Sequence, residues 1–125
     1  METRSLAAAK AFTTKDGSTI RELFGLPTGG TVLQSLAESR LPAGGSTERH
    51  YHAVTEEIYF ILQGRADMEL DGAHAELGPG EAVAIPPGAW HEIVALGDEE
   101  LRFLCCCAPP YTHEDTYFEE PPAGV

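Results

Sequence analysis

The residues of this chain best suited to chemistry are two histidines and two adjacent carboxylates within residues 44–64. His50 and His52 are separated by one residue, and successive side chains of an extended strand point to opposite faces. Both imidazoles therefore lie on one face, with Tyr51 on the other. Neutral imidazole is a common ligand of divalent transition metals, so this pair predicts part of a metal site.

A carboxylate and a third imidazole complete the expected ligand set. The apolar run at residues 56–62 can return antiparallel to the first strand and bring one carboxylate to the same place. Glu57 lies four residues before Ile61, so the two side chains point to the same face of the strand, whereas Glu56 falls at the turn. We therefore expect Glu57 to be the ligand. His91, in the later segment GEAVAIPPGAWH, supplies the fourth donor.

The spacing of these residues resembles that of the cupin superfamily. Its first motif is matched by Gly44, His50, His52, Glu57 and Gly64. Its second motif is matched by Gly80, Pro86, Gly88 and His91, and 15 residues separate the two motifs, as in compact single-domain cupins. The chain departs from the pattern at Ala95, where the second motif often has an asparagine, and we expect this change to affect loop geometry more than the metal site.

This resemblance implies an all-β fold, the cupin double-stranded β-helix or jelly-roll barrel. It implies one domain over residues 1–125, with a core at about 19–108 and a C-terminal tail at 109–125. One divalent transition metal per chain would be held by His50, His52, Glu57 and His91, and these ligands suit Fe, Mn, Ni, Co, Cu and Zn alike. The alternative is that His50 and His52 are ordinary polar positions on a solvated strand face and that Glu57 is a surface charge.

Turn signals divide most of the chain into short segments with the alternation typical of strands. We expect strands at residues 19–24, 31–38, 56–62, 65–70, 73–77, 81–85 and 101–107. Two further strands are expected, one that carries His50 and His52 and one after Pro86-Pro87-Gly88 that carries His91. Asp71-Gly72 predicts a two-residue hairpin turn. Helical turns are expected only at residues 6–11 and at Thr112 to Asp115, before the prolines of the tail. Eight or nine short strands are typical of a jelly roll.

The composition excludes several classes of partner. The formal charge is −12, from 8 basic and 20 acidic residues, which disfavours binding to nucleic acid or to an anionic membrane surface. Neither a signal peptide nor a stretch of eighteen apolar residues is visible, so we expect a cytoplasmic protein. The three consecutive cysteines, Cys105 to Cys107, cannot form a framework of well-spaced disulfides and are expected to be reduced.

Two residues are candidates for roles beside the ligands. Tyr59 follows Glu57 on the same strand face and is the best candidate for a catalytic acid or base, although it could equally be a packed core aromatic. Gln34 is a weaker candidate for the pocket wall, with a rim amide as the alternative.

Other residues are assigned by parity and position. Phe103, Cys105 and Cys107 share a face and are expected to line the barrel. His74 follows a hairpin turn and is expected at the surface, and Trp90 should face away from His91. In the tail, Tyr111 and His113 could fold over the pocket or remain plain surface residues.

Several functions fit such a site. Three neutral imidazoles and one carboxylate leave a divalent ion with a charge near +1, which suits a small substrate with an anionic oxygen. The resemblance implies a metal-dependent enzyme, either a dioxygenase or an isomerase that acts on a sugar or keto acid. The alternatives are a non-catalytic sensor or storage protein for a metal or small molecule, and a purely structural metal. Exposed strand edges predict a homodimer.

Overall fold

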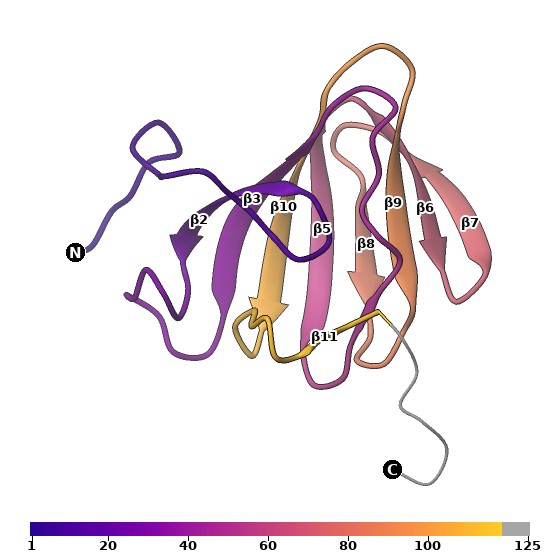
Figure 1. Cartoon of the computed structure of the whole chain (residues 1–125). Helices are drawn as coiled ribbons and strands as arrows, with labels where there is room; N and C mark the ends of the chain where they lie inside the picture. The colour runs from indigo at the N-terminus through magenta and orange to yellow at the C-terminus, as the bar shows by residue number, and fades with distance from the viewer. Residues whose placement is uncertain (119–125) are drawn as a thin grey trace, which may run out of the picture.

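The protein is described here from a computed structural model, in which residues 1–118 are described (Figure 1). These residues form antiparallel sheets and no helix, so the expected all-β jelly roll is confirmed. The strands are β1 (Phe12–Thr13), β2 (Thr19–Phe24), β3 (Ser35–Leu41), β4 (Tyr51–His52), β5 (Glu56–Gln63), β6 (Arg65–Leu70), β7 (Ala73–Leu77), β8 (Ala82–Ile85), β9 (His91–Leu96), β10 (Leu101–Ala108) and β11 (Thr116–Tyr117). Within residues 1–118, nothing has the helical length and apolar character needed to cross a lipid bilayer.

The larger sheet has the strand order β1-β2-β3-β10-β5-β8, and all of its neighbours are antiparallel. Alternation along β5 and β10 buries every second side chain, which gives the sheet an apolar inner face. Phe103 and Cys105 therefore point inward, together with Tyr59 and Ile61, as their parity predicted. The inward side of this sheet supplies one wall of the core.

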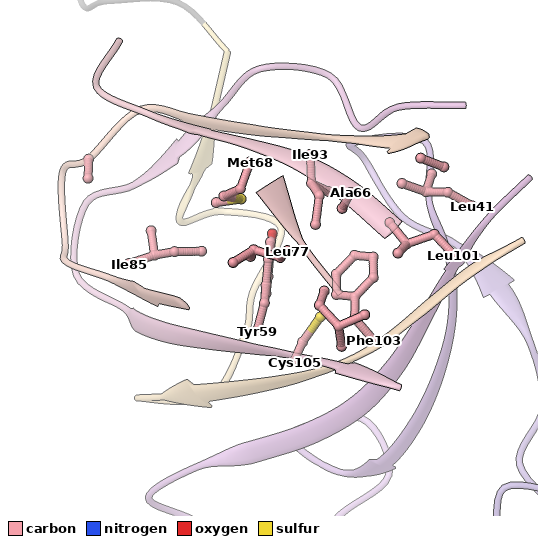
Figure 2. Packing of buried hydrophobic residues seen from close by; sticks show 13 residues of the cluster. Leu41, Tyr59, Ala66, Met68, Leu77, Ile85, Ile93, Leu101, Phe103 and Cys105 are labelled. Atoms are coloured by element: carbon pink, nitrogen blue, oxygen red, sulfur yellow. The ribbon is translucent and has the colours of Figure 1, made fainter. Parts of the chain in front are cut away.

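The smaller sheet has the order β7-β6-β9 and supplies the opposite wall. Asp71 and Gly72 join β6 to β7 with φ values of 47° and 88°, the two positive angles that a type I′ hairpin turn requires. Ala66, Met68 and Ile93 of this sheet meet Tyr59 and Phe103 of the larger sheet in the buried core, as Figure 2 shows.

The segment before β4 extends the smaller sheet. Thr47 donates its backbone N–H to the Ile93 carbonyl, and His50 and His91 exchange two backbone hydrogen bonds of 3.0 and 2.8 Å. Ala95 is buried, and its backbone pairs with Gly44 and Gly45. Backbone pairing therefore orders the loop at the position where the family pattern often has an asparagine.

The strand expected at residues 31–38 is wrong in its limits. β3 begins at Ser35 and ends at Leu41, and the exposed fractions of Val32 and Leu33 are both 81%. Thr31 donates its hydroxyl to the Gln34 carbonyl, which closes a turn after two glycines with positive φ. The inner face of β3 is therefore formed by Ser35 and its alternate neighbours, and the exposed Gln34 does not line the pocket.

The short expected elements also differ in extent. β4 contains only Tyr51–His52 and pairs with β11, so His50 belongs to the bridge with His91 instead. The N-terminal segment forms a turn near Leu6, and the tail forms a turn in which Asp115 N–H donates to the Thr112 hydroxyl. Neither turn is a helix. The tail prolines Pro121 and Pro122 lie outside the described residues.

A buried carboxylate ties β3 to β10 on the outer side of the larger sheet. Glu38 is 0% exposed and accepts hydrogen bonds from Arg40 at 2.6 Å and from Arg102 at 3.0 Å. Burial raises the pKa of Glu38, but the two guanidinium groups outweigh this effect and leave that pKa below its ordinary value. The ionised carboxylate therefore stabilises the fold.

Replacing Glu38 with glutamine should lower the free energy of unfolding at pH 7 by about 1–3 kcal/mol, because charged hydrogen bonds are lost at a buried site. Since folding lowers the pKa of Glu38, its contribution is complete above the unfolded value of about 4.3 and is lost as pH falls through the folded pKa. Urea unfolding of the wild type and of Glu38→Gln between pH 7 and pH 3 should show that the difference in their free energies of unfolding shrinks as the pH falls.

Glu76→Gln provides the matched control. Its carboxylate pairs with Arg65, but the two side chains are 55% and 57% exposed. This substitution should change stability by less than about 0.5 kcal/mol. If Glu38→Gln is as mild as the control, the buried triad contributes no stability.

Candidate metal centre

Three histidines meet at one place inside the barrel. Their donor nitrogens all lie within 4.8 Å of one another, and the residues are His50, His52 and His91. The antiparallel bridge sets the ring centroids of His50 and His91 4.3 Å apart, and the alternation along β4 adds His52 at 5.1 Å from His50. All three are buried, so the group is shielded from bulk water.

Backbone carbonyls fix the orientation of each ring. Nδ1 of His50 lies 2.6 Å from the Glu48 carbonyl, and Nδ1 of His91 lies 3.0 Å from the Ala89 carbonyl. Nδ1 of His52 lies 3.1 Å from the Asp115 carbonyl. A carbonyl oxygen can only accept, so each Nδ1 must carry the proton and donate. Each Nε2 then presents a lone pair, the form in which imidazole binds a metal.

Glu57 lies beside this group, on the same face as Tyr59, while Glu56 is exposed, as the strand parity predicted. Its Oε1 is 3.4 Å from Nε2 of His52 and 3.6 Å from Nε2 of His91. Its Oε2 accepts a hydrogen bond of 3.1 Å from the Cys107 thiol. That contact orients the carboxylate and leaves Oε1 aimed at the imidazoles.

The donor set fits a cation. Oε1 of Glu57 and Nε2 of His91 are buried side-chain atoms that have no hydrogen-bond partner among the described residues. Both are acceptors and they face each other, an arrangement that costs free energy unless a positive species lies between them. Two donors about 2.1 Å from one ion lie at most about 4.2 Å apart, so the Glu57 distances suit a shared ion. Ligation by Glu57 stays a prediction.

The protonation of the group also suits a cation. Burial and the neighbouring His91 lower the pKa of His50 to about 4, so this imidazole is neutral at pH 7. Burial would lower the pKa of His52, but the Glu57 carboxylate outweighs it and raises that pKa. Burial opposes ionisation of Glu57, yet His52 and His91 hold its pKa well below the ordinary range. Glu57 is therefore ionised at pH 7, beside the histidine group.

The group opens into a cavity of about 40 Å³. Its lining includes Tyr59, Phe103, Cys105 and Cys107, the residues that the sequence placed inside the barrel. Burial and the Glu57 charge raise the pKa of the Cys105 and Cys107 thiols, so both stay protonated. A larger open depression of about 740 Å³ lies beside the N-terminal segment, but none of the imidazoles lines it.

Two carboxylates near the site were not singled out from the sequence. Asp16, in the turn before β2, lines the cavity. Asp115 accepts hydrogen bonds from the backbone N–H groups at residues 53–55, just after His52. The polar turn Lys15-Asp16-Gly17-Ser18 was recognisable in the sequence, but nothing in its pattern indicated that it folds over the barrel.

The remaining candidates take simpler positions. Tyr111 lines the cavity, whereas His113 is exposed. Trp90 packs outside against Tyr51, at 4.7 Å between ring centroids, and so faces away from the metal site as expected. His74 is at the surface beside Asp67.

Comparison with known proteins agrees with this geometry. The family model Cupin_2, described as a cupin domain, matches residues 37–107. The uncharacterized protein MJ1618 of Methanocaldococcus jannaschii is 48% identical over 107 residues, which cover 86% of each chain. The 1-methylthio-D-xylulose 5-phosphate methylsulfurylase of Rhodospirillum rubrum is 42% identical over 65 residues, covering 51% of this chain and 40% of that protein.

A solved structure is similar over nearly the whole chain. The polyketide cyclase RemF from Streptomyces resistomycificus superimposes with a TM-score of 0.74 at 27% identity, covering 92% of this chain and 89% of that one. The family model spans more than half of the sequence and includes all four predicted ligands, from His50 to His91. With the antiparallel barrel and the buried histidine group, these matches show that the chain belongs to the cupin family.

Proposed function

We propose that this protein is a metal-dependent enzyme that moves a proton next to a carbonyl group, in an isomerase, cyclase or lyase reaction on a small oxygen-rich substrate. The observation that carries the proposal is the group of imidazole lone pairs and the Glu57 carboxylate, which face one another without a donor at the end of a buried cavity. A protein with only packed polar residues would leave these acceptors uncompensated.

The residues have distinct roles in this proposal. His50, His52, His91 and Glu57 hold one divalent transition metal. When bound, the metal supplies Lewis-acid polarisation of a substrate oxygen. The apolar wall around them, with Phe103 and Ile20 among its members, excludes water and so strengthens each charge interaction.

Tyr59 is suited to donate a proton or a hydrogen bond. Burial and the Glu57 charge raise its pKa well above 10, so the hydroxyl stays protonated and cannot serve as a base at neutral pH. No group among residues 1–118 forms a hydrogen bond with this hydroxyl, which leaves it available to a ligand in the cavity. Its ring packs on Phe103, at 4.7 Å between centroids, and this contact fixes its position.

The relatives support carbonyl chemistry more than oxygenation. One is named as a polyketide cyclase, and another bears a name that specifies a xylulose phosphate, which is a ketose. These activities belong to those proteins. For this chain they favour the isomerase version over the dioxygenase version that the same ligand set would allow.

The alternative is a cupin that binds a metal or small molecule without catalysis. The cavity favours this second possibility, because about 40 Å³ is far below the roughly 300–1,000 Å³ of typical ligand pockets. A compact substrate or a small inorganic ligand fits such a space best.

Elemental analysis should find about one divalent transition metal per chain after loading, since the donor set is single and buried. His52→Ala should lose that metal without unfolding, as judged by circular dichroism.

The metal-loaded protein should catalyse the exchange of carbon-bound hydrogen of ketoses or uronates with deuterium from deuterated water, measured by NMR. Oxygen uptake with diketones or catechols would instead indicate a dioxygenase, and tight ligand binding with neither reaction would indicate a binding protein.

Tyr59→Phe should lower the exchange rate by about 10²–10³-fold if the hydroxyl donates a hydrogen bond to the substrate oxygen, which becomes negatively charged as the neighbouring carbon loses its proton to water. The phenylalanine ring keeps the packing. Metal content and thermal stability serve as controls and should remain near wild type. An unchanged rate would assign Tyr59 to core packing alone.

We also propose that the chain forms a homodimer through the outer face of the larger sheet. Ile58 and Phe60 are 43% and 38% exposed, and they lie opposite Cys106 and Leu104 of β10. Leu36 of β3 continues this apolar face beyond Cys106. A second copy, which presents the same surface, is the occupant that symmetry favours.

Phe60→Glu should convert the dimer into a monomer, because it places a charge in the middle of that apolar face. Sedimentation velocity measures the change. Val32→Glu, at an exposed apolar residue of the loop before β3, is the control and should leave the dimer intact. A wild-type monomer, or a dimer that survives Phe60→Glu, would contradict this assignment.

A further inference from the structure

We propose that Asp16 supplies a second carboxylate to the metal centre, next to His50. The inference rests on the proposed metal-dependent function, and it adds a ligand outside the two sequence motifs. Asp16 belongs to the turn between β1 and β2, which in Figure 1 lies over β10 and β5. Its side chain is 15% exposed and lines the same cavity as His50, His52 and Glu57.

Only one of the two carboxylate oxygens of Asp16 accepts hydrogen bonds from the described residues. Oδ1 accepts hydrogen bonds from the Thr14 hydroxyl at 2.7 Å, the Ser18 backbone N–H at 2.9 Å and the Ser18 hydroxyl at 2.6 Å. Oδ2 receives no hydrogen bond within residues 1–118 and lies 3.8 Å from Nε2 of His50. Three donors on one oxygen therefore fix the direction in which the other oxygen points.

The backbone attaches this turn to the arm that carries His50. The Asp16 carbonyl accepts a hydrogen bond of 2.8 Å from the Glu48 N–H, and the Glu48 carbonyl accepts from Nδ1 of His50. Asp16 and His50 are thus positioned through the same residue. Their separation is set by local backbone geometry, whereas a surface carboxylate would have no such constraint.

The contact between Oδ2 of Asp16 and His50 resembles the contact between Glu57 and His91. Nδ1 of His50 donates to a carbonyl, so its Nε2 is an acceptor, and Oδ2 of Asp16 is also an acceptor. A cation between these two acceptors, which lie 3.8 Å apart, would stabilise both, as it would Glu57 and His91 at 3.6 Å. Each of these two pairs lies below the limit of about 4.2 Å for two ligands of one ion. The donors that all lie within 4.8 Å of one another are those of the three histidines alone, so both carboxylates must move toward the ion when it binds.

A second carboxylate has consequences for the substrate. Three neutral imidazoles with Glu57 and Asp16 reduce the charge of a divalent site to about zero, so a neutral carbonyl or hydroxyl compound is favoured over an anion. Five protein donors leave a six-coordinate ion one open position. One position suffices for a single substrate oxygen, whereas an oxygenase that holds substrate and O₂ together needs two.

The test is Asp16→Asn, whose amide oxygen can keep the Oδ1 hydrogen bonds and whose amide nitrogen replaces Oδ2. The affinity for Zn(II), measured by competition with a chromogenic chelator, should fall at least about tenfold, and the visible absorption of the Co(II)-loaded protein should change. Asp98→Asn removes the same charge from an exposed loop at the far end of β9 and should behave as wild type.

Each outcome separates the two proposals. Equal affinity and identical Co(II) spectra for Asp16→Asn and wild type would overturn the role of Asp16 and leave the metal-dependent function intact. Equal weakening by Asp98→Asn would also overturn it, because net charge alone would explain the effect. Absence of metal binding by the wild type would overturn the proposed function itself.

A wild-type readout covers the case in which Asp16→Asn does not fold. A crystal structure of the Zn(II)-loaded wild-type protein should place Oδ2 of Asp16 about 2.0–2.2 Å from the ion. An Oδ2 atom outside that range would overturn the assignment.

Discussion

The site depends on three hydrogen bonds from imidazole Nδ1 atoms to backbone carbonyls. Because each carbonyl can only accept, each ring is held in the tautomer that turns a lone pair toward the barrel interior. The carbonyls come from the arm before His50, the turn before His91 and the C-terminal segment. The orientation of the three imidazoles therefore depends on the correct folding of three separate parts of the chain. Their buried acceptor atoms would be stabilised by a bound cation.

The barrel supplies the second constraint, which is register. His50 and His91 lie directly opposite in an antiparallel bridge, and Glu57 points inward because it shares the parity of Tyr59 on β5. A shift of one residue would turn the whole inward set toward solvent. The apolar residues that fill the core thus also fix the position of the polar ones, so packing and site geometry cannot be separated.

Much of this could be predicted from the sequence, because strand parity and motif spacing are local properties. They placed His50, His52 and His91 together, put Phe103 inside and turned Trp90 outward. The start of β3 was missed, since Val32 and Leu33 alternate like strand residues but follow two glycines that form a turn. Asp16 and Asp115 were missed for a different reason. They reach the site through tertiary contacts, and the alternation of residues along a strand does not indicate where a segment outside the strands folds.

The turn before β2 and the segment after β10 meet beside the histidine group. Lys15 donates to the Thr116 carbonyl at 3.1 Å, which joins the turn before β2 to the segment that follows β10. The cavity is lined by strand residues such as Tyr59 and Phe103 and also by Asp16 and Tyr111 from these two segments. Substitutions in those two segments can alter the cavity lining while the strand residues of the core are kept, so selectivity can diverge between relatives that share the same barrel.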